Sequence, residues 1–156
     1  MLNEIQGDLL EYEVDVIAHQ CNCVTRGCSG IAYPIFRDNP QANTYTTNPN
    51  PTNYGSAQIF KANGKPYKYI ANIYGQYDVG HPRPLTIDSA EMRRMAFSQG
   101  LDIVYDWMME NGCTSIAFPK GIGCGLAGGD WEDYHQMILN MSTFFPEFTT
   151  TIVELV

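Results

Sequence analysis

A glycine-rich segment is the clearest candidate for ligand chemistry in this 156-residue chain. Residues 121–129 read Gly-Ile-Gly-Cys-Gly-Leu-Ala-Gly-Gly and lie between a predicted strand and a predicted helix. Without side chains, the backbone can close around a phosphate and turn its amide N–H groups toward it. The alternative is a turn that only connects a strand to a helix, but five glycines in nine residues favour a phosphate site.

Two common nucleotide motifs do not account for this segment. Gly123, Gly125 and Gly128 match the G-x-G-x-x-G spacing of dinucleotide-binding domains, but only 28 residues follow Gly128, too few for the rest of such a domain. The phosphate loop of nucleotide triphosphatases is absent as well, because the one Gly-Lys pair of the chain is followed by Pro66.

A second polar segment follows a predicted strand near the N-terminus. Residues 19–32 read His-Gln-Cys-Asn-Cys-Val-Thr-Arg-Gly-Cys-Ser-Gly-Ile-Ala, and the glycines open a short predicted helix. Polar residues at the end of a strand, followed by small residues, predict a second ligand-binding loop. A structural histidine that only forms hydrogen bonds in the core is the alternative interpretation of His19.

Two cysteine-based chemistries fit the second segment poorly. A zinc site would use His19 and the three cysteines that follow it, but their spacing lacks a C-x-x-C pair. A cysteine phosphatase would need an arginine six positions after its cysteine. The residues at those positions are Gly27, Ser29, Pro34, Pro119 and Asp130. We therefore expect no metal and no thiol nucleophile here.

Two aspartates have structural interpretations beside functional ones. Asp130 lies where the helix that begins at Trp131 needs its N-cap, with Asp133 three residues further on. Asp8, taken without further context, is a turn aspartate.

The elements that position these residues alternate between strands and helices. Strands are predicted over residues 2–6, 16–20, 57–62, 67–74, 115–118 and 149–155, and helices over 31–37, 87–108 and 131–144. This order is typical of an α/β layered fold with a mixed sheet. Residues 39–54, rich in Asn, Pro and Thr, are expected to form an irregular surface loop.

The long helix is predicted from an apolar stripe with steps of three and four residues. Its members are Ile87, Ala90, Arg94, Phe97, Leu101, Val104 and Met108. Only Arg94 is not apolar. Thr86 is the expected N-cap, and Asn111-Gly112 is the expected stop.

Composition narrows the class of protein. Hydrophobic residues make up 44% of the chain, which excludes a disordered protein, and the length suits a single domain over residues 1–156. The net charge of −8 argues against binding to bare duplex nucleic acid. No apolar run approaches a membrane span, which needs roughly 18 residues, and no leader is evident. Five cysteines, an odd number, favour reduced thiols and a cytoplasmic protein.

Three segments together resemble the macrodomain, an α/β module that binds ADP-ribose. They are residues 7–10 (Gly-Asp-Leu-Leu), residues 19–23 with Gly30-Ile31-Ala32, and residues 119–126 (Pro-Lys-Gly-Ile-Gly-Cys-Gly-Leu). Their order and intervals suit the family, and the resemblance spans nearly the whole chain. It implies a three-layer α/β/α sandwich around a mixed sheet of about six strands.

The resemblance also implies a binding role for each segment. Asp8 would contact the adenine amino group, Leu9 would lie near the base, and Asn22 would contact the distal ribose. The backbone of the loop at Ser29, Gly30, Ile31 and Ala32 would approach the diphosphate and that ribose. The residues expected to wrap the phosphates are Gly121, Ile122, Gly123, Cys124, Gly125 and Leu126. The resemblance does not name the aromatic that covers the adenine, and Tyr74, after the fourth predicted strand, is our candidate for it.

Within the superfamily, His-x-Cys-Asn-Cys followed by Gly-Ile-Ala is most similar to the branch that removes the phosphate from ADP-ribose-1″-phosphate. Under this hypothesis His19 acts as a general acid or base. Asp130 orients or activates the attacking water, and the amides of the glycine loop stabilise the phosphoryl charge. We expect neither a metal nor a cofactor in this reaction.

Two other functions stay open. Gly-Cys-Gly-Leu is also similar to a branch that hydrolyses ADP-ribosyl esters or ADP-ribosylated nucleobases. That branch uses a lysine near the middle of the chain and an aspartate directly after this motif. Here Ala127 takes the aspartate position, and no lysine lies between Ile73 and Gly80. The third function is a non-catalytic reader or scavenger of ADP-ribose derivatives. Only Arg26 and Lys120 are basic in or beside the two loops, so binding should depend weakly on salt.

Overall fold

The computed structural model describes residues 2–24, 30–47 and 51–156. The strands are β1 (Leu2–Gln6), β2 (Val14–Gln20), β3 (Ala57–Lys61), β4 (Tyr67–Ile73), β5 (Ser115–Pro119) and β6 (Thr149–Glu154). The α-helices are α1 (Ala32–Asp38), α2 (Thr44–Thr47), α3 (Ala90–Asn111) and α4 (Trp131–Phe144). Short 3-10 turns cover Leu9–Glu11, Pro40–Ala42 and Pro51–Asn53.

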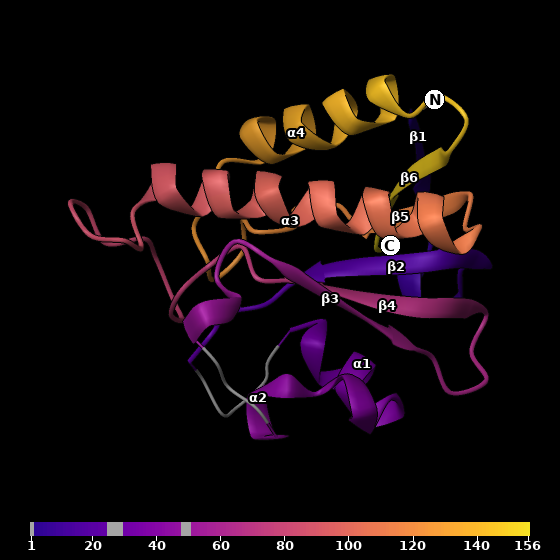
Figure 1. The fold of residues 1–156 in the computed structure, drawn as a ribbon, viewed down its shortest axis with the longest axis horizontal. Coiled ribbons are helices and arrows are strands. Elements are labelled where there is room, and N and C mark those ends of the chain that lie inside the picture. The colour runs from indigo at the N-terminus through magenta and orange to yellow at the C-terminus, as the bar shows by residue number, and fades with distance from the viewer. Residues whose placement is uncertain (1, 25–29, 48–50) are drawn as a thin grey trace.

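The strands form one mixed sheet in the order β1-β6-β5-β2-β4-β3. Every neighbouring pair is parallel except β3 and β4, which are antiparallel. Helices α3 and α4 cover one face of the sheet, while α1 and α2 lie on the other (Figure 1). This arrangement confirms the predicted α/β fold with its six-stranded sheet. It also brings the carboxyl ends of the five parallel strands to the same edge, where open α/β sheets place their ligands.

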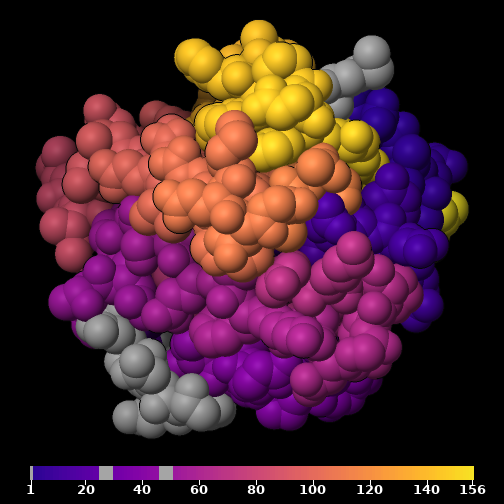
Figure 2. Space-filling view, turned by 45° about the vertical axis from the view of Figure 1, so that its right-hand side comes forward, coloured from indigo at the N-terminus to yellow at the C-terminus, as the bar shows by residue number. Residues whose placement is uncertain are grey.

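Each face of the sheet has its own core because successive strand residues point to opposite sides. On β2, Val16 packs into the cluster under α3 and α4, whereas Ile17 packs into the cluster against α1. Figure 2 shows the C-terminal part of α3, in orange, next to the yellow surface of α4. Because the central strands are buried on both faces, the edge formed by their carboxyl ends is rigidly supported.

Helix α3 begins later than predicted. Its N-cap is Ser89, whose hydroxyl accepts a hydrogen bond from the amide of Met92, and not Thr86. Thr86 instead caps the turn before the helix, where its hydroxyl accepts from the amide of Asp88. The predicted apolar stripe of this helix contained Arg94 as its one charged residue, and this is also wrong. Arg93 is the buried arginine, and Arg94 is partly exposed. Gly112, with φ of 71°, ends the helix as predicted.

The predicted surface loop over residues 39–54 is wrong for the part that the structure describes. The segment contains helical turns, and Asn39, Ala42 and Tyr45 are buried against the sheet. The side-chain amide of Asn39 donates to the carbonyl of Ile35 and to the hydroxyl of Tyr67. Its apolar residues complete the core beside α1. Within the described ranges, no helix has the length and apolar character needed to cross a bilayer.

Candidate functional site

A cleft of about 700 Å³ lies at the carboxyl edge of the sheet. Residues that end or follow all five parallel strands contribute to its lining. They are Asp8–Leu10 after β1, His19 and Gln20 on β2, Gln76 after β4, residues 119–127 after β5, and Val153 and Leu155 at β6, with Gly30, Ile31 and Pro34 from the start of α1. This volume lies in the usual range for a small-molecule site.

The loop over residues 121–129, called the glycine loop below, needs glycine at particular positions. Gly123 has φ of 77°, and a β-carbon there would lie 2.7 Å from the ring of Tyr134. Gly128 has φ of 73°, and a β-carbon there would collide with the ring of His81. Because other residues rarely adopt this conformation, only glycine lets the backbone turn so tightly beside these rings.

Backbone hydrogen bonds close the glycine loop on itself but leave several donors unused. The amide of Cys124 donates to Gly121 over 2.9 Å, and that of Gly128 donates to Gly125 over 3.0 Å. Among the described residues, five amides of the loop have no acceptor. They belong to Gly121, Gly123, Gly125, Leu126 and Ala127, all of which line the cleft. Such a run of unpaired N–H groups is suited to an anion.

Asp8 and Leu9 lie in the cleft lining as expected. One carboxylate oxygen of Asp8 accepts from the amide of Leu10 over 2.9 Å, so this residue is also the turn aspartate that the sequence predicts. Lys120 and Asp8 are the charged side chains of the described lining. Lys120 pairs with Glu154 at 3.1 Å. The amides, rather than free cations, are therefore the main donors available to an anion.

His19 borders the cleft, but its side chain is fully buried. Its Nε2 lies 2.7 Å from Oδ1 of Asn72, and the amide group of Asn72 donates to the carbonyl of Ala42. That bond fixes Oδ1 as an acceptor, so Nε2 of His19 carries the proton and Nδ1 the lone pair. Burial lowers the pKa of His19 to about 4. The ring is therefore neutral at pH 7, a form in which Nδ1 can accept a proton.

The structure does not place every predicted residue in the cleft lining. Asn22 is buried, and its Oδ1 accepts from the amide of Val24. Ala32 is buried at the start of α1, and Ser29 lies outside the described residues. Neither Asn22 nor Ala32 belongs to the described lining.

The expectations for Asp130 and Tyr74 have different outcomes. Asp130 is exposed, and its carboxylate accepts from the amide of Glu132 over 3.0 Å as the N-cap of α4. Tyr74 does not cover the cleft, which corrects the sequence prediction. It is buried under the sheet edge, where its hydroxyl donates to Gln58. Its aromatic ring packs in the hydrophobic core on the α1 side of the sheet.

Burial raises the pKa of the three described cysteine thiols near the cleft. The pKa of Cys23 rises to about 12 and that of Cys124 to about 11, and burial also raises the pKa of Cys21. The three thiols are therefore protonated at neutral pH. In the described part of the chain, no three His, Cys, Asp or Glu side chains are placed to share a metal ion.

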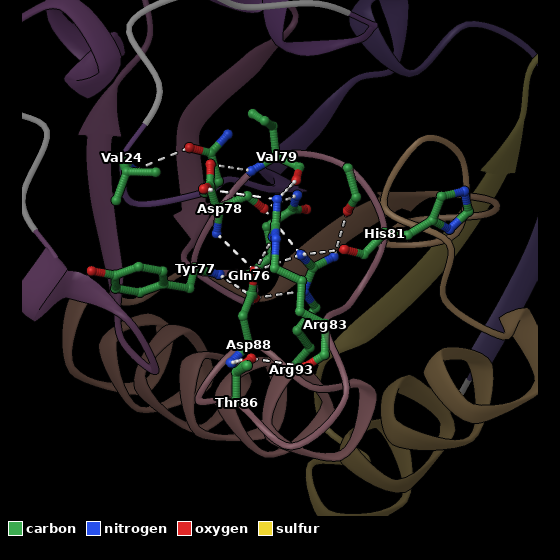
Figure 3. A network of polar contacts seen from close by, with 12 residues as sticks. Val24, Gln76, Tyr77, Asp78, Val79, His81, Arg83, Thr86, Asp88 and Arg93 are labelled. Atoms are coloured by element: carbon green, nitrogen blue, oxygen red, sulfur yellow. Dashed lines mark hydrogen bonds and ion pairs between the residues drawn. The ribbon is translucent and has the colours of Figure 1, made fainter.

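A buried ion pair that sequence reasoning missed lies behind the glycine loop. Asp88 and Arg93 are 3% and 1% exposed, and Nε of Arg93 donates to Oδ1 of Asp88 over 2.7 Å. The carboxylate also accepts from the amides of Tyr77 and Asp78 and from Arg83. Figure 3 shows these bonds converging on the pair. Burial opposes ionisation of Asp88, but the bonds from Arg93 and the two amides outweigh it and lower its pKa.

The comparisons with known proteins give a consistent result. The sequence profile of the family described as Macro domain matches residues 18–138. The macrodomain of Mycobacterium tuberculosis DarG is 25% identical, with a TM-score of 0.79, covering 98% of this chain and 97% of that one. The Thermus aquaticus DarG macrodomain is 23% identical, with a TM-score of 0.76 over 98% and 97% of the two chains.

A more distant structure has the same fold. The Oceanobacillus iheyensis macrodomain, in a glycine-to-valine variant with ADPR, is 15% identical and has a TM-score of 0.73 over 98% of this chain and 84% of that chain. No curated protein matches the chain.

Proposed function

This chain belongs to the Macro domain family, and from that premise we propose that its cleft binds ADP-ribose or a close derivative. The observation that carries the proposal is the run of five unpaired amides in the glycine loop. An ADP-ribose diphosphate offers the acceptor oxygens that these donors lack. The Trypanosoma brucei macrodomain in complex with ADP and the Oceanobacillus iheyensis macrodomain with ADPR support the ligand class.

The charges of the cleft favour a compact ligand with few phosphates. Its one basic side chain in the described lining, Lys120, is already paired with Glu154. The second carboxylate oxygen of Asp8, which also lines the cleft, can accept a hydrogen bond from the adenine amino group. Since neutral amides hold the diphosphate, ADP-ribose affinity should fall only slightly between low and moderate salt.

Calorimetry with ADP-ribose tests the proposal. The variant Gly123→Ala forces a β-carbon toward Tyr134 at a residue with positive φ, so it should distort the loop and weaken binding by about tenfold or more. Gly64→Ala is the matched control, because Gly64 also has positive φ but lies in the turn between β3 and β4 with open space around it. It should bind like the wild type. Absence of ADP-ribose binding to the wild-type protein at millimolar concentration contradicts the proposal.

A second candidate function is hydrolysis of the phosphate of ADP-ribose-1″-phosphate. It is supported by the position of His19, a buried residue that borders the same cleft as the unpaired amides. In this reaction His19 acts as the general base toward water, and the amides stabilise the phosphoryl charge. Asp130 would orient the water from the N-terminus of α4.

Phosphate release in EDTA tests the second function. Activity that rises with pH around 4 and is lost in His19→Asn supports it, because that variant keeps a donor for Asn72 but has no titrating base. Full activity in both His19→Asn and Asp130→Ala contradicts the assigned roles. An ADP-ribosylated peptide and an ADP-ribosylated oligonucleotide, run in parallel, separate a phosphatase from an ADP-ribosyl hydrolase. Tight ADP-ribose binding without turnover of any substrate identifies a reader.

A further inference from the structure

We propose that Arg93 is a positioning residue that holds the glycine loop in its anion-binding conformation. The inference rests on the proposed function, since it concerns the donors that would hold the diphosphate. Arg93 is not part of the cleft lining in the described structure. It acts through the carbonyl groups that its guanidinium binds.

The guanidinium of Arg93 joins two loops that are far apart in the sequence. Its Nη1 donates to the carbonyl of Ala127 over 3.1 Å and to that of Gly80 over 2.8 Å. Its Nη2 donates to the carbonyl of Asp78 over 3.1 Å, while Nε and Nη2 also bind the carboxylate of Asp88. The side chain is 2% exposed, so water cannot replace these partners.

The bond to Ala127 determines which way one peptide group of the glycine loop faces. A peptide unit is rigid and planar, so holding its carbonyl also fixes the amide on its other side. That amide belongs to Gly128 and donates to the carbonyl of Gly125, which closes the turn over residues 125–128. The unpaired amides of Gly125, Leu126 and Ala127 lie within this turn. Without Arg93 the carbonyl of Ala127 is free to rotate toward the cleft, where its negative end repels an anion.

The same arginine supports the opposite wall of the cleft. The carbonyl of Asp78 accepts from Arg93 and also from the side-chain amide of Gln76 over 2.9 Å. Gln76 lines the cleft, and its Oε1 accepts from Gln20, another lining residue. The ring of His81, turned away from the network in Figure 3, lies against Gly128. One side chain thus sets the relative position of Gln76 and the glycine loop.

Charge attraction between Arg93 and a ligand is a weaker explanation. The guanidinium is neutralised by Asp88 at 2.7 Å and lies outside the lining. Lysine at position 93 keeps the charge but replaces a planar fork of five donors with one nitrogen, which cannot bind Asp88 and the separate carbonyls together. Arg93→Lys therefore separates orientation from charge.

Amide-resolved NMR titrations of ADP-ribose and of adenosine, which lacks phosphate, test the inference. Arg93→Lys should weaken ADP-ribose binding by about tenfold or more and adenosine binding by no more than about twofold. In the free protein it should also shift the amide signals of Gly125, Leu126 and Ala127. Arg94→Lys is the matched control, because Arg94 is the next residue on α3 and pairs with Asp133 at the surface. It should change none of these quantities.

Each outcome of these titrations either supports or overturns the positioning role of Arg93. Unchanged ADP-ribose affinity in Arg93→Lys, or equal losses for both ligands, overturns the positioning role. If wild-type protein does not bind ADP-ribose, the proposed function fails, and the amide signals of the free variant still decide whether Arg93 orients the loop. If Arg93→Lys does not fold, Asp88→Asn replaces it, since that side chain keeps its shape and one acceptor oxygen. It should show the same selectivity with a loss of about threefold.

Discussion

Two buried polar pairs lie near the cleft, and they differ in charge. His19 and Asn72 form a neutral pair on adjacent strands, closed by the bond from Asn72 to Ala42. Asp88 and Arg93 form an ionic pair at the start of α3, with bonds to backbone groups of several loops. His19 of the first pair belongs to a recognisable motif, whereas no motif marks its partner Asn72 or either member of the second pair.

The difference shows that a motif residue and a residue that holds a loop need not coincide. A neutral pair on adjacent strands keeps those strands in register and needs no counterion. A buried ion pair pays a large desolvation cost, so its many hydrogen bonds must compensate. Those bonds reach the glycine loop and the segment after β4, which gives the ionic pair the wider structural influence.

Removing one member of the ionic pair should have the largest effect. Arg93→Met leaves the carboxylate of Asp88 buried without its main counterion, and we expect a loss of about 3–5 kcal/mol in the free energy of unfolding. Denaturant unfolding at pH 7 measures it. The double variant Asp88→Asn with Arg93→Met should recover part of the loss, because no charge is then stranded. If Arg93→Met lowers the free energy of unfolding by less than about 1 kcal/mol, the ion pair contributes little to the stability of the fold.

The neutral pair of His19 and Asn72 should make the free energy of unfolding depend on pH. The pKa of His19 is lowered from 6.5 to about 4 in the folded protein, so the unfolded chain binds more protons between these values. Its contribution is complete above about pH 6.5 and declines as the pH falls toward 4, by about 2–3 kcal/mol. Urea unfolding from pH 7.5 to 4.5 measures this. His19→Asn should flatten the profile in this window, and an unchanged profile contradicts the assignment.

Acid should affect the ionic pair in a lower window. The folded pKa of Asp88 lies below 3.8, so its contribution is present above that value and is lost as the pH falls through the folded pKa. Asp88→Asn should therefore leave the decline between pH 6.5 and 4 unchanged.

An exposed acid provides a smaller effect for comparison. Asp130→Ala removes the N-cap of α4 and should cost about 1 kcal/mol in the free energy of unfolding. ADP-ribose affinity should stay within about twofold, because Asp130 is not in the described cleft lining. Calorimetry and thermal unfolding of the same sample test both parts. A large loss of phosphate release with intact folding would support the water-orienting role that we propose for Asp130 in the phosphatase reaction.

The exposed neighbour of Arg93 should have the smallest effect. Arg94 is 3.7 Å from Asp133, and both side chains are about half exposed. A double-mutant cycle with Arg94→Ala and Asp133→Ala should give a coupling below about 0.5 kcal/mol. A coupling as large as that of Asp88 and Arg93 would remove the distinction between buried and exposed pairs.

The sequence predicts most of the fold because its signals are local. Alternating strands and helices, the glycine turns and the caps at Asp130 and Gly112 depend on nearby residues. The cleft segments follow from strand ends, which meet at one edge in a parallel sheet. The resemblance to the macrodomain family then assigned a binding role to each of these segments.

The errors concern contacts between distant residues. Arg93 is buried because its partners lie at residues 78, 80, 81, 88 and 127, and no spacing along α3 reveals them. Residues 39–47 pack on the sheet through Ala42 and Tyr45, although their composition is that of a surface loop. Tyr74 was misplaced because its hydroxyl partners, Thr44 and Gln58, come from other elements.

The unpaired amides of the glycine loop have a consequence for how this sequence can change during evolution. Main-chain donors are present whatever side chain a residue carries, so positions such as Leu126 and Ala127 are free to vary without loss of the anion site. Selection should act on the positive-φ residues Gly123 and Gly128 and on the remote Arg93. Homologous sequences would then diverge more at cleft residues such as Leu126 than at the buried Arg93, the reverse of what is expected when side chains recognise the ligand.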